Sequence, residues 1–260
     1  MSTSSDSAPP ELVVVMPVYN EAANISSVVR EWFGCLDRVV PHFLLLALND
    51  GSTDETATIL ASLTEDLGSR LRAVNKPNSG HGSSCREGYE LALGEGAPWI
   101  LQVDSDGQCD PAFFEEFFTN RAAYDCLFGN RRTRDDGLGR VVISFCCRVL
   151  LWLTTGTYLK DPNVPYRLVR ASALRTALRS IPEDFNLQNI ALTFVLQREQ
   201  ALRWKHFPIH FRARQAGENS INYRKIATMG LNFLHDLSRI THEDSHTWWR
   251  PSWARRRMAS

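Results

Sequence analysis

Short apolar runs alternate with segments of helical spacing along the first hundred residues. Each run is rich in Val, Leu or Ile and is followed by polar turn residues, which indicates a buried strand. The predicted strands occupy residues 12–16, 43–48, 71–74 and 97–103, and the predicted helices occupy residues 24–36, 55–67 and 84–93. This alternation predicts an α/β fold with a parallel sheet covered by helices on both faces. Ligands of such sheets bind at the carboxyl ends of the strands.

The pattern is more varied after residue 110. We expect a helix over 111–123, a strand over 126–129, a basic loop over 129–140 and an apolar helix over 141–155. Loop, helix and strand are then expected over 161–169, 181–197 and 202–212. Residues 226–240 have amphipathic helical spacing, and the last residues are rich in Trp and Arg. The predicted organisation is a disordered tail (1–10), one domain (11–225) and a C-terminal extension (226–260).

Composition narrows the classes of function. The chain of 260 residues is 43% hydrophobic, and its 29 basic side chains equal its 29 acidic ones, so no overall charge attracts nucleic acid. The first ten residues are polar and the most apolar segment, 141–153, is interrupted by Ser144 and Arg148, which predicts neither signal peptide nor membrane span. Six cysteines without metal-ligand spacing favour reduced thiols and a cytoplasmic protein.

Four polar motifs follow the predicted strands. They are Pro17–Glu21, Asn49–Asp54, Asn78–Gly82 and Asp104–Gln108. Asp104 and Asp106 are separated by one residue at a strand end, and paired carboxylates there suit Mg²⁺ or Mn²⁺, which take oxygen ligands and substrate phosphates. Taken singly, such motifs are more often solvated acidic pairs and turns.

Taken together, the four motifs resemble those of the family 2 glycosyltransferases, which are inverting enzymes of the GT-A fold. Within that family the chain is most similar to polyprenyl-phosphate glycosyltransferases of the dolichyl-phosphate mannose synthase kind. The resemblance covers residues 11–225. It implies a Rossmann-like, mostly parallel sheet with a C-terminal helical extension, and metal-dependent transfer of a sugar from a GDP- or UDP-linked donor to a polyprenyl phosphate.

The resemblance also implies roles for individual residues. Metal ligands are Asp104, Asp106 and Gln108. Donor-binding residues are Pro17, Tyr19, Asn20, Glu21, Asp50, His81, Asp104 and Arg214, with Tyr19 stacking on the nucleobase and Asp50 accepting from a base N–H. Acceptor-binding residues are Arg131, Arg132, Arg140, Ser144 and Arg167, because guanidinium groups suit a phosphomonoester. Catalytic residues are Asp106, Arg131, Arg140 and Asp184. Asn49 stands where many relatives carry Asp.

Two other functions remain open. Transfer to a hydroxyl of a soluble acceptor needs a carboxylate base, for which Asp184 is the candidate; the alternative for Asp184 is an acidic side chain stabilising a helix N-terminus. A non-catalytic nucleotide-sugar binding module is the other function, and the paired Asp104 and Asp106 argue against it.

The C-terminal region contains two further patterns. His242–His246 matches H-E-x-x-H, but it lies in a polar stretch near the chain end and is interpreted as a coincidence. The tail interleaves Trp with Arg, which favours contact with the inner membrane face over nucleic-acid binding. A core-facing helix followed by a disordered tail is the alternative.

Overall fold

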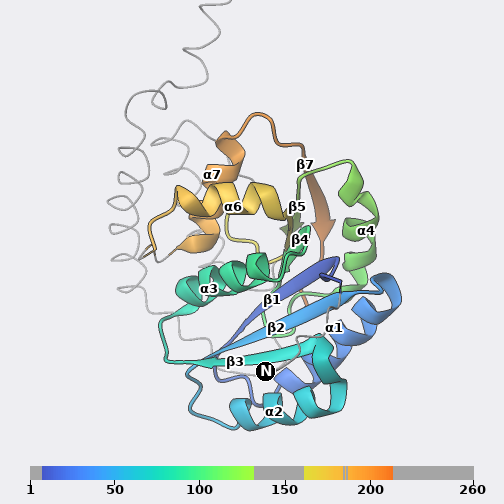
Figure 1. The fold of residues 1–260 in the computed structure, drawn as a ribbon, viewed down its shortest axis with the longest axis vertical. Helices are drawn as coiled ribbons and strands as arrows, with labels where there is room; N and C mark the ends of the chain where they lie inside the picture. The colour runs from blue at the N-terminus through green and yellow to red at the C-terminus, as the bar shows by residue number, and fades with distance from the viewer. Residues whose placement is uncertain (1–7, 132–160, 184, 186, 213–260) are drawn as a thin grey trace, which may run out of the picture.

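The described strands form one seven-stranded sheet in the order β3-β2-β1-β4-β6-β5-β7 (Figure 1). The structure is a computed structural model that describes residues 8–131, 161–183, 185 and 187–212. The strands are β1 (Leu12–Val18), β2 (Phe43–Asp50), β3 (Leu71–Lys76), β4 (Trp99–Gln102), β5 (Cys126–Arg131), β6 (Arg167–Arg170) and β7 (Trp204–Ile209). The α-helices are α1 (Ile25–Val39), α2 (Thr56–Leu67), α3 (His81–Gly94), α4 (Phe114–Thr119), α6 (Ala171–Arg179) and α7 (Gln188–Arg198). Short 3₁₀ turns are η1 (Gly68–Arg70), η2 (Pro111–Phe113) and η3 (Asn120–Ala122).

The sheet is mostly parallel, which confirms the predicted fold class. β1 lies between β2 and β4 and is parallel to both, and β2 and β3 are also parallel. β6 is antiparallel to both of its neighbours, β4 and β5, while β5 and β7 are parallel. The chain builds outward from β1 to β3 and then returns to place β4 on the other side of β1, so the strand order reverses between β1 and β4, and a crevice at such a reversal is where ligands of open α/β sheets bind.

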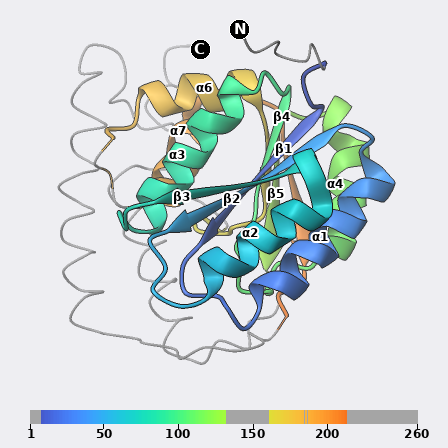
Figure 2. The same ribbon diagram turned by 60° about the horizontal axis from the view of Figure 1, so that its bottom comes forward.

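Helices cover both faces of the sheet. α1, α2 and α4 lie on one side, and α3, α6 and α7 lie on the other (Figures 1 and 2). Right-handed connections explain this division, because a chain that steps outward from β1 to β3 and then returns to β4 must place α3 on the opposite face from α1 and α2.

The apolar spacing that predicts the first helix corresponds to its buried face. Ile25, Val28, Val29, Trp32 and Phe33 are all buried in α1. β1 and β2 are buried along their whole length, as expected for central strands covered on both faces. These two strands therefore hold the loops that follow them on a rigid base.

α3 begins earlier than predicted, at His81 rather than near Ser84. Gly80 precedes it with φ +89°, a backbone conformation that favours glycine. At Gly88 the helix approaches the sheet so closely that a Cβ atom would lie 2.3 Å from Val15 Cγ1. The N-terminus of α3 is thereby held against the carboxyl ends of β1 and β2.

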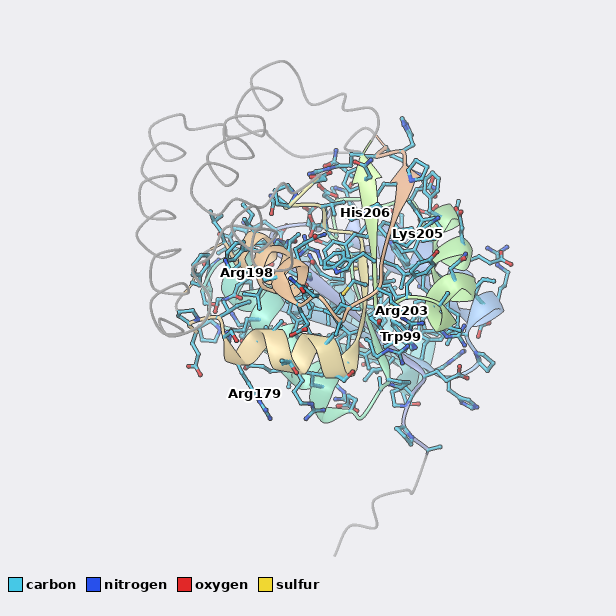
Figure 3. All side chains as sticks on the ribbon, turned by 90° about the horizontal axis from the view of Figure 1, so that it is seen from above. Trp99, Arg179, Arg198, Arg203, Lys205 and His206 are labelled. Carbon is cyan, nitrogen blue, oxygen red and sulfur yellow. The ribbon has the colours of Figure 1, made fainter. Side chains whose placement is uncertain are left out.

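Three elements differ from the sequence prediction in the second half. The helix expected over 111–123 is a short α4 flanked by the 3₁₀ turns η2 and η3. The loop expected over 161–169 ends in strand β6, and α6 follows it without having been predicted. β7 forms an edge of the described sheet, with Lys205 and His206 along it (Figure 3), and an edge strand tolerates Pro208.

Several predicted segments lie outside the described residues. These are most of the disordered tail (1–7), the loop and helix of 132–160, and the whole extension of 226–260 with its H-E-x-x-H pattern and its Trp/Arg tail. Among the helices that the structure does describe, none has both the length and the apolar character needed to cross a membrane.

Candidate active site

A cavity of about 460 Å³ opens at the carboxyl ends of β1, β2 and β4. Its lining includes most of the predicted donor and metal residues, namely Pro17, Tyr19, Glu21, Asp50, His81, Asp104 and Asp106. Asn78, Gly80, Ser84 and Ser105 complete the polar part of its wall. Residues from four separate motifs thus meet in one place, because parallel strands end at the same edge of the sheet.

The loop after β1 carries Tyr19, whose side chain is 49% exposed although aromatic rings are usually buried. An exposed ring on a cavity wall suits stacking on a planar ligand. The neighbouring Asn20 has φ +52° and does not line the cavity. Its N–H donates to Ser52 Oγ at 2.9 Å, and its Oδ1 accepts from Thr53 N at 2.8 Å. Asn20 therefore ties the β1 loop to the β2 loop, and its contact with a donor stays a prediction.

Asp50, at the end of β2, organises the loop that leads into α3. Its Oδ1 accepts from Lys76 Nζ at 2.7 Å and from Ser79 N at 2.9 Å, and its Oδ2 accepts from Gly80 N at 2.9 Å. Burial raises the pKa of this carboxyl, but the hydrogen bonds from Lys76 and the loop outweigh burial, and the pKa is lowered overall. A carboxylate oxygen can accept more than one hydrogen bond, so the predicted contact of Asp50 with a base N–H stays a prediction.

Lys76, the ammonium partner of the Asp50 carboxylate, was not identified from the sequence. Its side chain is only 9% exposed, and its Nζ also donates to Ser79 Oγ and, at 3.4 Å, to Ser84 Oγ. A buried ammonium group requires such partners. The signal in the sequence was a lysine just beyond a predicted strand, directly before the Pro-Asn-Ser-Gly turn.

Asp104 follows β4 and faces the cavity with a side chain 28% exposed. Its Oδ1 lies 3.5 Å from Gln102 Nε2 and 3.8 Å from His81 Nε2. Burial raises the pKa of Asp104 to about 6; His81 opposes this shift, and the nearby Asp106 adds to it. Gln102 is itself oriented by Tyr89, whose hydroxyl donates to Gln102 Oε1 at 2.9 Å, and both residues are buried. Sequence reasoning missed this pair, although Gln102 is the polar residue within the apolar run that precedes Asp104.

His81 lies beside the carboxylates at the start of α3. Its Nε2 lies 3.5 Å from Cys85 Sγ and 3.8 Å from Asp104 Oδ1, and its side chain is 54% exposed. The Cys85 sulfur and then the Asp104 carboxylate raise the pKa of His81. The imidazole is thus placed where a protonated ring would face the paired aspartates.

The chemistry of the predicted metal ligands fits Mg²⁺ or Mn²⁺. Asp104 and Asp106 offer two carboxylates, and the Gln108 side chain adds an amide in the same loop, where Gln108 N donates to Asp106 Oδ1 at 3.0 Å. Hard divalent cations take such oxygens together with phosphate oxygens. No group of three or more His, Cys, Asp or Glu side chains is placed to hold a metal within the described residues. The two carboxylates would therefore depend on the Gln108 oxygen and on ligand phosphates to complete a coordination shell.

Two arginines predicted to bind an acceptor phosphate have protein partners. Arg131, at the end of β5, makes a two-point salt bridge with Asp161, with both N–O distances 2.7 Å. Arg167 is completely buried and donates to backbone carbonyls, including Val164 O and Asn189 O, each at 2.8 Å. The expectation of a phosphate-facing Arg167 is corrected by this geometry, because its guanidinium joins the 161–166 segment to α7 and burial lowers its pKa.

The remaining candidates lie outside the described residues. They are Arg132, Arg140, Ser144, Asp184 and Arg214. The described cavity wall thus contains the predicted residues Pro17, Tyr19, Glu21, Asp50, His81, Asp104 and Asp106, whereas Asn20, Gln108 and Arg131 do not line it.

Comparison with known proteins decides the family. Residues 13–179, more than half of the chain, match the domain described as glycosyl transferase family 2. The chain belongs to glycosyl transferase family 2. This confirms the resemblance carried by the four motifs.

Curated relatives of this family 2 chain include undecaprenyl-phosphate 4-deoxy-4-formamido-L-arabinose transferases. The protein of Enterobacter sp. (strain 638) is 26% identical over 86% of this chain and 65% of its own length. The protein of Salmonella paratyphi A is 24% identical over 89% of this chain and 68% of its own length. The chain therefore spans about two thirds of the length of these relatives.

Solved structures confirm the fold. Glucosyl-3-phosphoglycerate synthase from Mycobacterium tuberculosis, in complex with Mn²⁺, uridine diphosphate and phosphoglyceric acid, superposes with a TM-score of 0.63. It is 20% identical in sequence, and the match covers 89% of this chain and 78% of the synthase. At that identity the likeness supports the GT-A-type arrangement of sheet and helices, and nothing finer.

Proposed function

We propose that this family 2 protein is an inverting glycosyltransferase that moves a sugar from a GDP- or UDP-linked donor to a polyprenyl phosphate, with Mg²⁺ or Mn²⁺ as its cofactor. The observation that carries the proposal is the cavity itself. It gathers an exposed aromatic ring (Tyr19), a buried carboxylate at the end of β2 (Asp50) and a carboxylate pair after β4 (Asp104 and Asp106). These are the groups needed to hold a nucleobase at one end and a pyrophosphate at the other.

The charge of the cavity supports a role for a cation. Asp104 and Asp106 line the wall where a donor's diphosphate would lie, and like charges repel strongly in a partly buried site. A bound Mg²⁺ or Mn²⁺ would neutralise the diphosphate and stabilise the charge of the departing nucleotide. Asp104, Asp106 and Gln108 would hold it, and His81 would supply further positive charge.

A polyprenyl phosphate is the acceptor favoured by the similarity to the undecaprenyl-phosphate transferases. One oxygen of the acceptor phosphate would attack the anomeric carbon from the face opposite the nucleotide. The bond between that carbon and the donor diphosphate would break, leaving a nucleoside diphosphate and a sugar joined to the lipid phosphate. Such a phosphate is already an anion near neutral pH, so this transfer needs little help from a general base.

Arg131 is the described residue best placed to assist an acceptor phosphate. Arg131 lies at the end of β5. Its positive charge is close enough to Asp104 to oppose the rise in pKa that burial causes in that carboxyl. Its salt bridge with Asp161 fixes the guanidinium plane, and a planar guanidinium binds a phosphate more selectively than a flexible ammonium group does.

The test is transfer of label from radioactive GDP-mannose, UDP-glucose and UDP-N-acetylglucosamine, with Mn²⁺, to undecaprenyl phosphate or to water-soluble sugars and phosphoglycerate. Label that moves into the organic phase supports the proposal and names the donor. Label that stays on a soluble acceptor favours the second function and makes Asp184 the next residue to change. Absence of any Mn²⁺-dependent turnover of a donor would favour a binding module.

Asp106→Ala is the matching variant. We expect it to lower metal-dependent donor turnover by at least about 100-fold, since it removes one of two carboxylates that would hold the cation. Circular dichroism would establish that the variant is folded. Normal turnover in a folded Asp106→Ala protein would contradict the assignment of the site.

A further inference from the structure

The segment that follows β7 is joined to the loop that carries the predicted metal ligands. Arg212 N donates to Gln108 O at 3.1 Å, and Gln108 Nε2 donates to Arg212 O at 3.2 Å. Between these bonds Cys109 and Phe211 form an antiparallel bridge. Residues 108 and 212 are thus paired through both the backbone and the Gln108 side chain, although 104 residues separate them.

The side chain of Arg212 fixes this pairing to two further elements. Its Nη1 donates to both carboxylate oxygens of Glu31 on α1, at 2.7 and 2.8 Å, and its Nη2 donates to Asp110 Oδ1 at 2.7 Å. Asp110 in turn accepts from Ala112 N at the start of η2. The Arg212 guanidinium therefore connects α1, the segment that follows β7, and Asp110 in the segment that carries the predicted metal ligands.

This connection fixes the side chain of Gln108, two residues after Asp106 on the cavity wall. Its side-chain amide has one nitrogen and one oxygen, and the nitrogen is engaged by Arg212 O, so the oxygen is the atom left for a cation. Gln108 N also donates to Asp106 Oδ1 at 3.0 Å, so a shift of residue 108 would move Asp106 as well. Two of the three predicted metal ligands depend on the position of one residue.

We infer that Arg212 is a positioning residue for the divalent-cation site: by anchoring Gln108, and through it Asp106, it sets the affinity of the loop for Mg²⁺ or Mn²⁺. The inference rests on the proposed metal-dependent function. Outer partners that orient metal ligands typically contribute about 10- to 100-fold to metal affinity. A merely structural salt bridge, by contrast, would alter stability and leave the affinity for the cation unchanged.

The chain offers a matched control in Arg203. It also pairs with a carboxylate, Asp125, and it precedes β7 where Arg212 follows it. Arg203→Met removes a guanidinium salt bridge next to the same strand but at its opposite end. Arg203→Met loses its ion pair with Asp125, whereas Arg212→Met loses ion pairs with Glu31 and Asp110, and only Asp110 belongs to the segment that carries the predicted metal ligands.

The deciding measurement is Mn²⁺ affinity without donor, by calorimetry or electron paramagnetic resonance. The melting temperature in EDTA reports stability separately. We expect Arg212→Met to weaken Mn²⁺ binding about tenfold or more, Arg212→Lys to weaken it less, and Arg203→Met to change it by less than about twofold. Equal Mn²⁺ affinity in wild type and a folded Arg212→Met protein would overturn the inference.

Two further outcomes are distinguishable. If Arg212→Met does not fold, Glu31→Gln replaces it, because it weakens the contact of Arg212 with α1 while keeping Arg212 itself. Unchanged Mn²⁺ affinity in both Glu31→Gln and Arg212→Lys would then overturn the inference. If the wild-type protein binds no Mn²⁺ either alone or with GDP or UDP present, the proposed metal site itself is contradicted, and the role of Arg212 is contradicted with it.

Discussion

Asp125 gives a stability prediction whose size follows from the structure. Its carboxylate accepts from Arg170 Nε at 2.8 Å, from Arg203 Nε at 3.0 Å and from Arg203 N at 3.1 Å. It thus joins β6 to the segment that leads into β7, and its partner Arg170 lies over the ring of Trp99 at the amino end of β4. Asp125→Asn keeps the shape of the side chain and removes its charge.

The pKa of Asp125 gives the magnitude. Hydrogen bonds from Arg203 and Arg170, opposed by burial, lower it from 3.8 to about 2. A shift of that size corresponds to about 2 kcal/mol of native-state stability, and solvent screening around the half-exposed Arg203 side chain reduces the expected value to about 1–2 kcal/mol. Because the folded pKa is the lower one, this stability is fully present above pH 4 and is lost as the pH falls from about 4 to 2.

Urea denaturation of wild type and Asp125→Asn at pH 7, 4, 3 and 2 tests this reasoning. The difference in the free energy of unfolding should be about 1–2 kcal/mol at pH 7 and should shrink towards zero by pH 2. Asp66→Asn is the control, since its salt bridge with Arg30 is about half exposed on both sides and should contribute less than about 1 kcal/mol at any pH. A difference for Asp125→Asn that is the same at pH 7 and pH 2 would refute the link to its ionisation.

Two other predictions concern groups beneath the cavity. Lys76→Met should destabilise the protein by about 3 kcal/mol or more, because it leaves the buried Asp50 carboxylate without its ammonium partner; urea denaturation checks this, and wild-type stability would contradict it. Tyr89→Phe leaves Gln102 Oε1 without its donor and should cost about 1–3 kcal/mol while weakening Mn²⁺ binding through Asp104. Thr193→Val, which removes another buried hydroxyl that donates to Pro162 O at 3.0 Å, is its control for Mn²⁺ affinity, and equal weakening in both variants would contradict a specific role for Tyr89.

The sequence was sufficient for features that depend on local periodicity. The spacing of Ile25, Val28, Val29, Trp32 and Phe33 predicts α1, and those side chains form its buried face. The position of Asp104 after an apolar run predicts its place at a strand end, and the structure puts it on the cavity wall. In both cases the residues that determine the structural feature lie within a few positions of it, so a local pattern in the sequence is enough to predict it.

Features that depend on distant contacts were not predictable in the same way. β6 has four residues and contains two arginines, so its own composition does not indicate a strand; it becomes one because it lies between β4 and β5. Arg167 looks like a phosphate-binding residue in the sequence, but carbonyl oxygens of the 161–166 segment and α7 surround it in the fold. The pairing of Lys76 with Asp50 likewise joins the ends of two strands 26 residues apart.

The reversal of strand order next to β1 separates the sheet into strands from the earlier part of the chain and strands from the later part. Among the described residues, those that line the cavity lie between Pro17 and Asp106, while β5, β6 and β7 come from later in the chain and occupy the other end of the sheet. The two parts meet in the sheet through the antiparallel pairing of β4 with β6. Within the described residues the cavity wall is thus encoded by one continuous stretch of the chain, so substitutions in the later part reach it only through packing contacts such as those of Arg212 with Glu31 and Asp110.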